Sequence, residues 1–264
     1  MYIVHFMDTT AAPQGAQVVS KVTAILRAVS TTMPQGAGTS GIARAAGIAR
    51  PTAHRLLSAL SAEGFIDRDQ RSGRWLLGPE LYLMGAVAAE RYDITEFARE
   101  HVTALAQATG ESAFLSARRG AETICLLRRD GSFPIRSFVL HEGKRFPLGV
   151  ASAGLAILAF LPDDEIRRTL SQNDLEAAHG PEHSATALWE RVAETRRAGY
   201  AVNPGLIVEG SWGMGAAVFD PSGQPAWALS LTGIESRFSP ERRPELGRLL
   251  LEHAHRLTEK LASR

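Results

Sequence analysis

The sequence is poor in cysteine, in long apolar runs and in features of an exported protein. One cysteine, Cys125, stands among 264 residues, so no disulfide can form within the chain and no cluster of thiolates can hold a metal. No stretch reaches the run of about 20 apolar residues that a spanning helix needs. Residues 1–17 lack the basic-then-apolar order of a secretory signal. We therefore expect a cytoplasmic protein with no membrane partner.

The net charge of the chain is small, but the charged residues are unevenly distributed. The chain has a net charge of +1, with 45% hydrophobic and 22% charged residues, a composition typical of globular domains. Residues 18–78 hold eight basic and three acidic side chains, a net +5, so the remainder carries −4. A basic first quarter on a mildly acidic body indicates an anionic partner at one end, unless these charges only form solvated surface.

The basic quarter has the pattern of three helices and a hairpin. Apolar spacing predicts helices over 18–29, over about 39–46 with Thr39 or Ser40 as cap, and from Arg50 to about Glu63. Two short strands are predicted at 65–68 and 74–77, joined by a polar, basic tip. Residues 1–16 show no period and are expected to form a flexible arm.

The rest of the chain has the texture of an α+β domain. Helices are predicted over 80–91 and 94–109, and then strands alternate with helices. The further predicted strands are 113–117, 123–128, 135–140, 200–202, 215–220 and 226–232. The further predicted helices are 152–160, one from Pro162, 188–198 and one from a Ser239 cap to about Leu261.

The short helix, glycine turn and longer helix near the start form a helix-turn-helix pattern. A second helix that enters the major groove needs a slender, donor-rich face near its start, and guanidinium groups suit guanine and phosphate. A small helical hairpin used for protein contacts is the alternative. The candidate DNA-binding residues, on this helix, its neighbour and the hairpin tip, are Arg44, Arg50, Pro51, Thr52, His54, Arg55, Arg68, Arg71 and Arg74.

Several separated motifs resemble one family. The stretch 42–60, IARAAGIARPTAHRLLSAL, is followed by EGFIDRD from Glu63, GRWLLGP from Gly73 and RFPLGVASAGLAILAFLP from Arg145. Later come RAGYAV from Arg197, AVFD from Ala217 and ALSLTG from Ala228. In this order they resemble the IclR family of bacterial transcriptional regulators, over roughly 18–261.

The resemblance implies a fold and a set of partners. It implies a winged helix-turn-helix DNA-binding domain at 17–78, a linker helix at 79–93 and a GAF-like effector-binding domain at 94–264. The implied partners are a double-stranded, pseudo-palindromic DNA operator, a small-molecule carboxylate effector and further copies of the chain, as a homodimer or a dimer of dimers. No cofactor is implied.

The resemblance also implies an effector pocket, whose carboxylate would meet backbone N–H groups at a helix start. Small residues around Gly149 and Gly154 would let these donors approach an anion. Many members have His at position 149, Lys at 155 and Cys at 213, where this chain has Gly, Leu and Gly. The implied wall is Ile135, Phe138, Gly149, Ala151, Ser152, Ala153, Asn203, Ser211, Trp212, Gly213, Met214, Ser230 and Thr232.

The departures suggest a roomier, more apolar pocket for an aromatic or otherwise bulky carboxylate. Simple core packing of Trp212 and Met214 is the other interpretation. Catalysis is not expected, because Val150 replaces the first glycine of a nucleophile elbow around Ser152. No histidine pair has a third metal ligand nearby, and Cys125, among apolar neighbours, reads as an inert thiol. The remaining alternative is an enzyme or small-molecule carrier whose N-terminal helices mediate oligomerisation.

Overall fold

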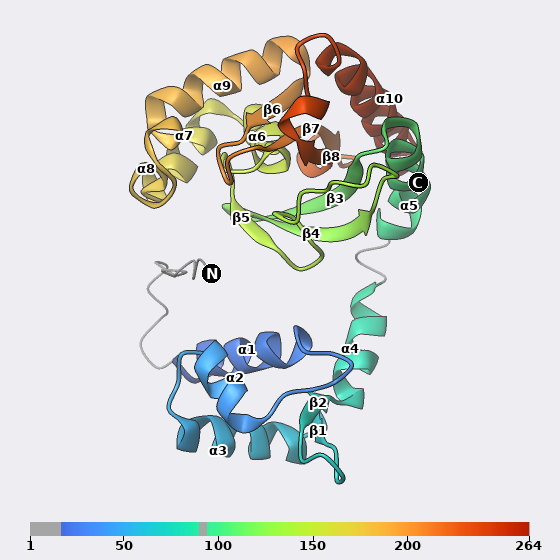
Figure 1. Ribbon diagram of the computed structural model, residues 1–264. Helices are drawn as coiled ribbons and strands as arrows, with labels where there is room; N and C mark the ends of the chain where they lie inside the picture. Colours follow the sequence, from blue (N-terminus) through green and yellow to red (C-terminus); the bar gives the residue numbers. More distant parts are fainter. Residues whose placement is uncertain (1–16, 90–93, 264) are drawn as a thin grey trace. The chain divides into compact units, whose positions relative to one another are not determined.

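The computed structural model describes residues 17–89 and 94–263. It forms two compact units, residues 1–92 and 93–264, which are described separately (Figure 1). The predicted arm at 1–16 and the end of the predicted linker, 90–93, lie outside the described residues. The domain boundaries expected at 78 and 93 therefore stay predictions.

The first unit is a three-helix core with a two-stranded hairpin. Its elements are α1 (Gln17–Ser30), α2 (Thr39–Ala45), α3 (Arg50–Ala62), β1 (Ile66–Arg68), β2 (Trp75–Leu77) and α4 (Pro79–Ala89). The apolar stripes of the helices meet Ile66 and Trp75 of the hairpin in one buried cluster. The bend between α2 and α3 contains Gly47 at φ 65°, a conformation that side chains with a Cβ rarely adopt.

The start of α2 differs from the prediction. Its N-cap is Gly38, and no side chain caps the helix. The hydroxyl of Thr39 is used elsewhere, because it accepts a hydrogen bond of 2.9 Å from the indole N–H of Trp75. Trp75 also pairs with Ala37 in an isolated bridge. The hairpin is thus held against the chain that enters α2.

The second unit is built on one six-stranded antiparallel sheet. Its strands are β3 (Ser112–Arg119), β4 (Glu122–Arg129), β5 (Arg145–Pro147), β6 (Tyr200–Pro204), β7 (Ser211–Phe219) and β8 (Pro225–Ile234). They lie in the order β5-β4-β3-β8-β7-β6. The helices are α5 (Ile94–Thr109), α6 (Ser152–Ala159), α7 (Asp163–Gln172), α8 (Leu175–His179), α9 (Ala185–Ala198) and α10 (Arg243–Ala262).

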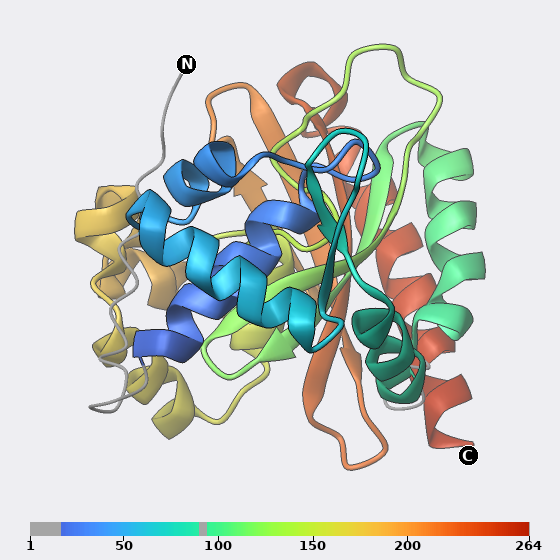
Figure 2. The ribbon, with the colours of Figure 1, turned by 90° about the horizontal axis from the view of Figure 1, so that it is seen from below.

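The sheet has a different cover on each face. Helices α5 and α10 lie side by side on one face, where Leu115, Met214 and Leu231 join their core (Figure 2). Helix α6 packs on the other face, with α7 and α9 beyond it. Strand alternation therefore decides whether a residue of β7 or β8 joins the α5–α10 core or meets α6. This mixed α/β unit with a curled sheet agrees with the predicted GAF-like domain.

Two predicted elements of this unit were wrong. Residues 135–140 form no strand, because Pro134 has no N–H for a ladder and Asp130 ties the segment into a loop. The last helix begins at Arg243 and not at Ser239. The N–H groups of Arg242 and Arg243 bond the Ser239 carbonyl, but Pro244 has no N–H to continue that turn and instead takes an early position in α10. The short β5 and α8 were not predicted.

Candidate functional site

The outer face of α3 is basic and lies free on the surface. Ala53, Leu57 and Leu60 point into the core and are at most 9% exposed. Arg50, Pro51, His54 and Arg55 are exposed, and Thr52 is half-buried. Arg44 on α2 is also exposed. The 3.6-residue period thus separates a buried stripe from a row of donors on the first two turns of α3.

The hairpin tip carries three more exposed arginines. The Asp69 carboxylate accepts hydrogen bonds of 2.6 Å from the N–H and the hydroxyl of Ser72, which hold the pKa of Asp69 below its usual value. The Arg68 guanidinium lies 5.4 Å from the centre of the Trp75 ring. Arg74 donates to the carbonyl of Gly36 at 3.1 Å. Arg68 and Arg74 therefore also brace the hairpin, while Arg71 is placed at its tip.

A small cavity lies in the second unit between the sheet and the first turn of α6. Eight of the implied wall residues line it, namely Ala151, Ser152, Ala153, Asn203, Ser211, Trp212, Gly213 and Thr232. Six further lining residues were missed, namely Ser116, Thr123, Val139, Leu140, Phe146 and Ile207. The cavity is therefore apolar at one side and edged by hydroxyl groups.

The first turn of α6 borders the cavity without a cap. Ala151, the N-cap residue, has no side-chain oxygen to accept the first N–H groups. The N–H groups of the first helical turn have no acceptor within the helix. Gly213 and Gly215 of β7 let this turn approach, since a Cβ on either would stand 3.0 Å from atoms of Ser152. The helix start is thus pressed onto the sheet beside the cavity.

Asn203 and Ser211 fix the loops around the cavity. The Asn203 amide donates to the carbonyl of Val150 at 2.7 Å and accepts from the N–H of Leu206 at 3.0 Å. The Ser211 and Ser137 hydroxyls lie 2.6 Å apart. Two of these hydrogen bonds, Asn203 to Val150 and Ser137 to Ser211, join parts of the chain that are far apart in the sequence. These side chains therefore position the wall, in addition to facing the cavity.

Two hydroxyls on β8 have no acceptor or donor within reach. The Oγ of Ser230 and the Oγ1 of Thr232 are buried, and neither has a hydrogen-bond partner in the structure. Thr232 lines the cavity, whereas Ser230 is fully buried two residues along the same strand face. A buried hydroxyl without a partner carries a desolvation cost of about 1–3 kcal/mol. The Thr232 hydroxyl is therefore available to a polar ligand or to water in the cavity.

Five of the implied wall residues lie away from the cavity lining. Ile135 and Phe138 are 58% and 73% exposed on the loop between β4 and β5. Met214 is fully buried in the α5–α10 core, so core packing is the interpretation that holds for it. Gly149, at φ 92°, packs against Leu188, and Ser230 is fully buried on β8.

The predicted roomy pocket was wrong. The space in which the centre of a water molecule fits is about 30 Å³, enough for roughly two waters. Trp212 borders the cavity, but its ring packs with the α5–α10 core and lies 5.1 Å from the Arg243 guanidinium. Ile207, from the segment that departs from the family pattern, also takes up space in the wall.

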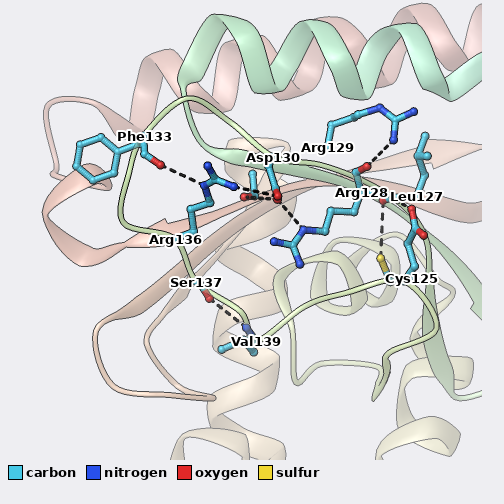
Figure 3. A network of polar contacts seen from close by, with 11 residues as sticks. Cys125, Leu127, Arg128, Arg129, Asp130, Phe133, Arg136, Ser137 and Val139 are labelled. Atoms are coloured by element: carbon cyan, nitrogen blue, oxygen red, sulfur yellow. Dashed lines mark hydrogen bonds and ion pairs between the residues drawn. The ribbon is translucent and has the colours of Figure 1, made fainter. Parts of the chain in front are cut away.

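Ion pairs hold the loop that covers the cavity (Figure 3). Asp130 accepts from the guanidinium groups of Arg128 at 2.6 Å and Arg136 at 3.0 Å. Burial raises the pKa of Asp130, but the hydrogen bond and charge of Arg128 outweigh it, so the pKa lies below its usual value. Ser137, further along, donates to Ser211 or accepts from it and also accepts from the N–H of Val139. We call the loop segment 130–139 the cover. Ion pairs at Asp130 and hydrogen bonds at Ser137 hold it in place.

The described residues hold neither a metal cluster nor a membrane-spanning helix. Within 17–89 and 94–263, no three side chains of histidine, cysteine, aspartate or glutamate are arranged to hold a metal ion. None of the helices in these ranges is long and apolar enough to cross a membrane. Cys125 is buried, and burial raises the pKa of its thiol to about 12, as expected for an unreactive cysteine.

The chain matches two family models. Residues 18–70 match the IclR helix-turn-helix domain, and residues 86–259 match the bacterial transcriptional regulator IclR C-terminal domain. The HTH-type transcriptional regulator KipR of Bacillus subtilis (strain 168) is 28% identical over 216 residues, which cover 81% of this chain and 86% of KipR. The glycerol operon regulatory protein of Streptomyces griseus is 30% identical over 211 residues, covering 78% and 81% of the two chains.

Solved structures share the fold. The Thermotoga maritima IclR crystal structure has a TM-score of 0.72 at 25% identity and covers 93% of this chain and 98% of its own. A crystal structure of an IclR homologue from Microbacterium hydrocarbonoxydans complexed with 4-hydroxybenzoate has a TM-score of 0.75 at 23% identity, covering 93% and 99%. With its DNA-binding helix-turn-helix and its mixed α/β C-terminal domain, this chain belongs to the IclR family of bacterial transcriptional regulators.

Proposed function

We propose that the protein is a ligand-responsive regulator that places α3 in the major groove of a pseudo-palindromic operator. The observation that carries this is the exposed row of Arg50, His54 and Arg55 on a helix whose opposite face is buried. Arg50, Thr52 and Arg55 read the base edges or fix the position of α3 on the DNA. Arg71 and Arg74 contact the phosphate backbone. The positive end of α3 adds attraction for phosphate.

Two copies of the chain bind two half-sites in this proposal. Helix α4 supports it, because Tyr82 and Val87 are 77% and 72% exposed and Leu83 and Met84 are about half exposed. An apolar helix that is exposed in a single chain is a candidate contact with another protein surface. A second copy is the occupant that a palindromic operator requires. Sedimentation of the free protein as a monomer at all concentrations would oppose this part.

The effector is a small organic carboxylate bound in the cavity at the start of α6. The uncapped first turn of α6 supplies N–H donors, and Thr232 supplies a hydroxyl without a protein partner. Val139, Leu140, Phe146 and Ile207 supply apolar wall. An aromatic acid is the finer proposal, supported by this wall and by the 4-hydroxybenzoate in a protein of the same fold.

An aromatic ring needs more room than the cavity has. The present 30 Å³ therefore requires that the cover at 137–139 or the segment around Ile207 shifts when such a ligand binds. Ligand binding would then favour one arrangement of the cover. The free-energy difference between the arrangements would couple the cavity to the DNA-binding unit. Because Ser137 ties the cover to Ser211, this hydrogen bond is the contact expected to break.

A thermal-shift screen of carboxylates, followed by DNA retardation with the acid that stabilises most, tests the proposal. We expect benzoates to raise the melting temperature and to change the affinity for a retarded genomic fragment. Tight glyoxylate binding with none for benzoates would overturn the aromatic part. Chemical turnover of the bound acid would instead favour an enzyme.

A further inference from the structure

A second cavity lies at the edge of the sheet, beside the outer strand β6. Its volume is about 300 Å³, and none of the residues that line it lines the effector cavity. Tyr200 of β6, Thr195 of α9 and Pro240 and Pro244 at the entry to α10 form its walls. We call it the edge cavity. Two arginines, Arg191 of α9 and Arg243 of α10, also line it.

Each of the two arginines also has one buried N–H group without an acceptor among the described residues. The Nη2 of Arg191 and the Nε of Arg243 are buried, and neither has a hydrogen-bond partner within residues 17–89 and 94–263. The other end of the Arg191 guanidinium donates to the carbonyl of Gly149, at 3.5 Å. Burial lowers the pKa of Arg191 to about 10, so the group stays cationic at neutral pH.

Neighbouring arginines of the same region are paired, which makes this pair distinctive. Arg237 and Arg242 each contact the buried Glu111 carboxylate at 2.7 Å. Within the described ranges, neither Arg191 nor Arg243 forms such an ion pair. A buried guanidinium without an anion is costly, and a ligand that brings its own oxygens offsets that cost.

The charges around the edge cavity favour an anion but include competitors. Glu194 lines the cavity, and both Glu194 and Glu182 attract Arg191. Glu241, on the exposed surface, is attracted to Arg243. The lining itself therefore holds two positive charges and one negative charge. Helix α10, 20 residues long and without a capping side chain, adds its positive end at Arg243.

One of the two arginines, Arg243, also contacts a wall residue of the effector cavity, and Arg191 contacts the segment that leads into α6. The Arg243 guanidinium lies 5.1 Å from the ring centre of Trp212, which borders that cavity. Arg191 contacts Gly149, which lies two residues before the N-cap of α6. An oxyanion that draws the Arg243 guanidinium toward itself therefore changes a contact of this wall.

We propose that the edge cavity binds a small oxyanion with two or more negative charges, held by Arg191 and Arg243, as a ligand separate from the carboxylate effector. The planar fork of a guanidinium pairs with two oxygens at once, which a phosphate group or a polycarboxylate supplies and chloride does not. At about 300 Å³ the cavity admits either class. Because Arg243 contacts Trp212 of the effector cavity, the bound anion also modulates that cavity.

Tryptophan fluorescence of the full chain during titration with inorganic phosphate, and separately with citrate, tests this at constant ionic strength set by chloride. We expect a saturable change that Trp212→Phe removes, because Arg243 lies over that ring. Arg243→Gln and Arg191→Gln should each weaken binding about tenfold or more, as expected for loss of a charge-assisted hydrogen bond. Glu194→Gln should strengthen binding, because it removes the competing carboxylate.

Two matched variants keep the test specific. Arg248→Gln changes an exposed arginine of the same helix that pairs with Glu252, so binding should stay as in the wild type. Arg55→Ala removes a cation of the DNA-contact face and should also leave the signal intact. If only phosphate or only citrate responds, the responding chemistry is the ligand class. No saturable change with either anion, or equal changes in the wild type and Arg243→Gln, overturns the proposal.

Discussion

Gly213 on β7 lies directly against Ser152 at the start of α6, and a Cβ at position 213 would stand 3.0 Å from the Ser152 hydroxyl oxygen. Two positions along, a Cβ at Gly215 would stand 3.0 Å from backbone atoms of Ser152. The two glycines therefore set how closely the helix start approaches the sheet. One faces a side chain that can turn, and the other faces a backbone that cannot.

This difference predicts unlike effects for two similar substitutions. Gly215→Ala should lower the free energy of unfolding by about 1–3 kcal/mol, because the backbone of α6 must shift. Gly213→Ala should cost less than about 1 kcal/mol but weaken the response to carboxylates, since it pushes the Ser152 hydroxyl toward the cavity. Urea unfolding and the carboxylate screen measure the two effects. Equal stability losses for the pair would contradict the packing described.

The partly buried contact between His101 on α5 and His253 on α10 predicts a loss of stability in mild acid. Their Nδ1 atoms lie 3.0 Å apart, and burial, followed for His101 by the charge of His253, lowers both pKa values. The unfolded chain thus takes up protons at a higher pH than the folded chain. The free energy of unfolding is therefore undiminished above the pKa of a histidine in the unfolded chain, about 6.5. It decreases as the pH falls toward the lower pKa values of the two histidines in the folded chain.

Substitution of either histidine should flatten that pH dependence. His101→Gln and His253→Gln are expected to reduce the slope of unfolding free energy between about pH 7.5 and about pH 5.5, each by up to about 1.4 kcal/mol per pH unit. Glu100, Glu252, Arg256 and Lys260 surround the pair and remain in both variants. His255→Gln is the control, because His255 is exposed and pairs with Glu259. A wild-type slope in both test variants would contradict the burial of this pair.

Cys125 should be unreactive until the second unit unfolds. Its thiol is 2% exposed and donates weakly to the carbonyl of Leu127, and burial raises its pKa to about 12, so thiolate is scarce at pH 8. A thiol-reactive disulfide reagent should label none of the native protein and the single cysteine after denaturation. Rapid labelling of native protein would contradict the buried position.

The first unit could be predicted well because its signals are local. The spacing of Ala53, Leu56, Leu57 and Leu60 predicts the buried face of α3, and all but the half-buried Leu56 are buried there. Gly47 marks the bend before the helix. The capping of α2 could not be predicted in this way. The Thr39 hydroxyl has two uses, and only the position of Trp75, 36 residues later, decides between them.

The candidate cavity was predicted in part, because strand pairing decides the rest. Small residues at 151–153 predict a helix start that an anion can approach. Ser116, Thr123 and Phe146 face the cavity only through the register of β3, β4 and β5. Ile135 and Phe138 were misplaced because an apolar run has the same pattern in a strand and in a loop that ion pairs hold in place.

The salt dependence of operator binding, compared between the wild type and Arg55→Ala, tests the central claim most directly. Fluorescence anisotropy with a retarded genomic fragment should show affinity falling steeply with salt, because phosphate contacts release counterions. Arg55→Ala should weaken binding by about 1–3 kcal/mol, whereas Arg167→Ala, an exposed arginine of α7, should not. No binding by the wild type at low ionic strength, or wild-type affinity in Arg55→Ala, would contradict the account.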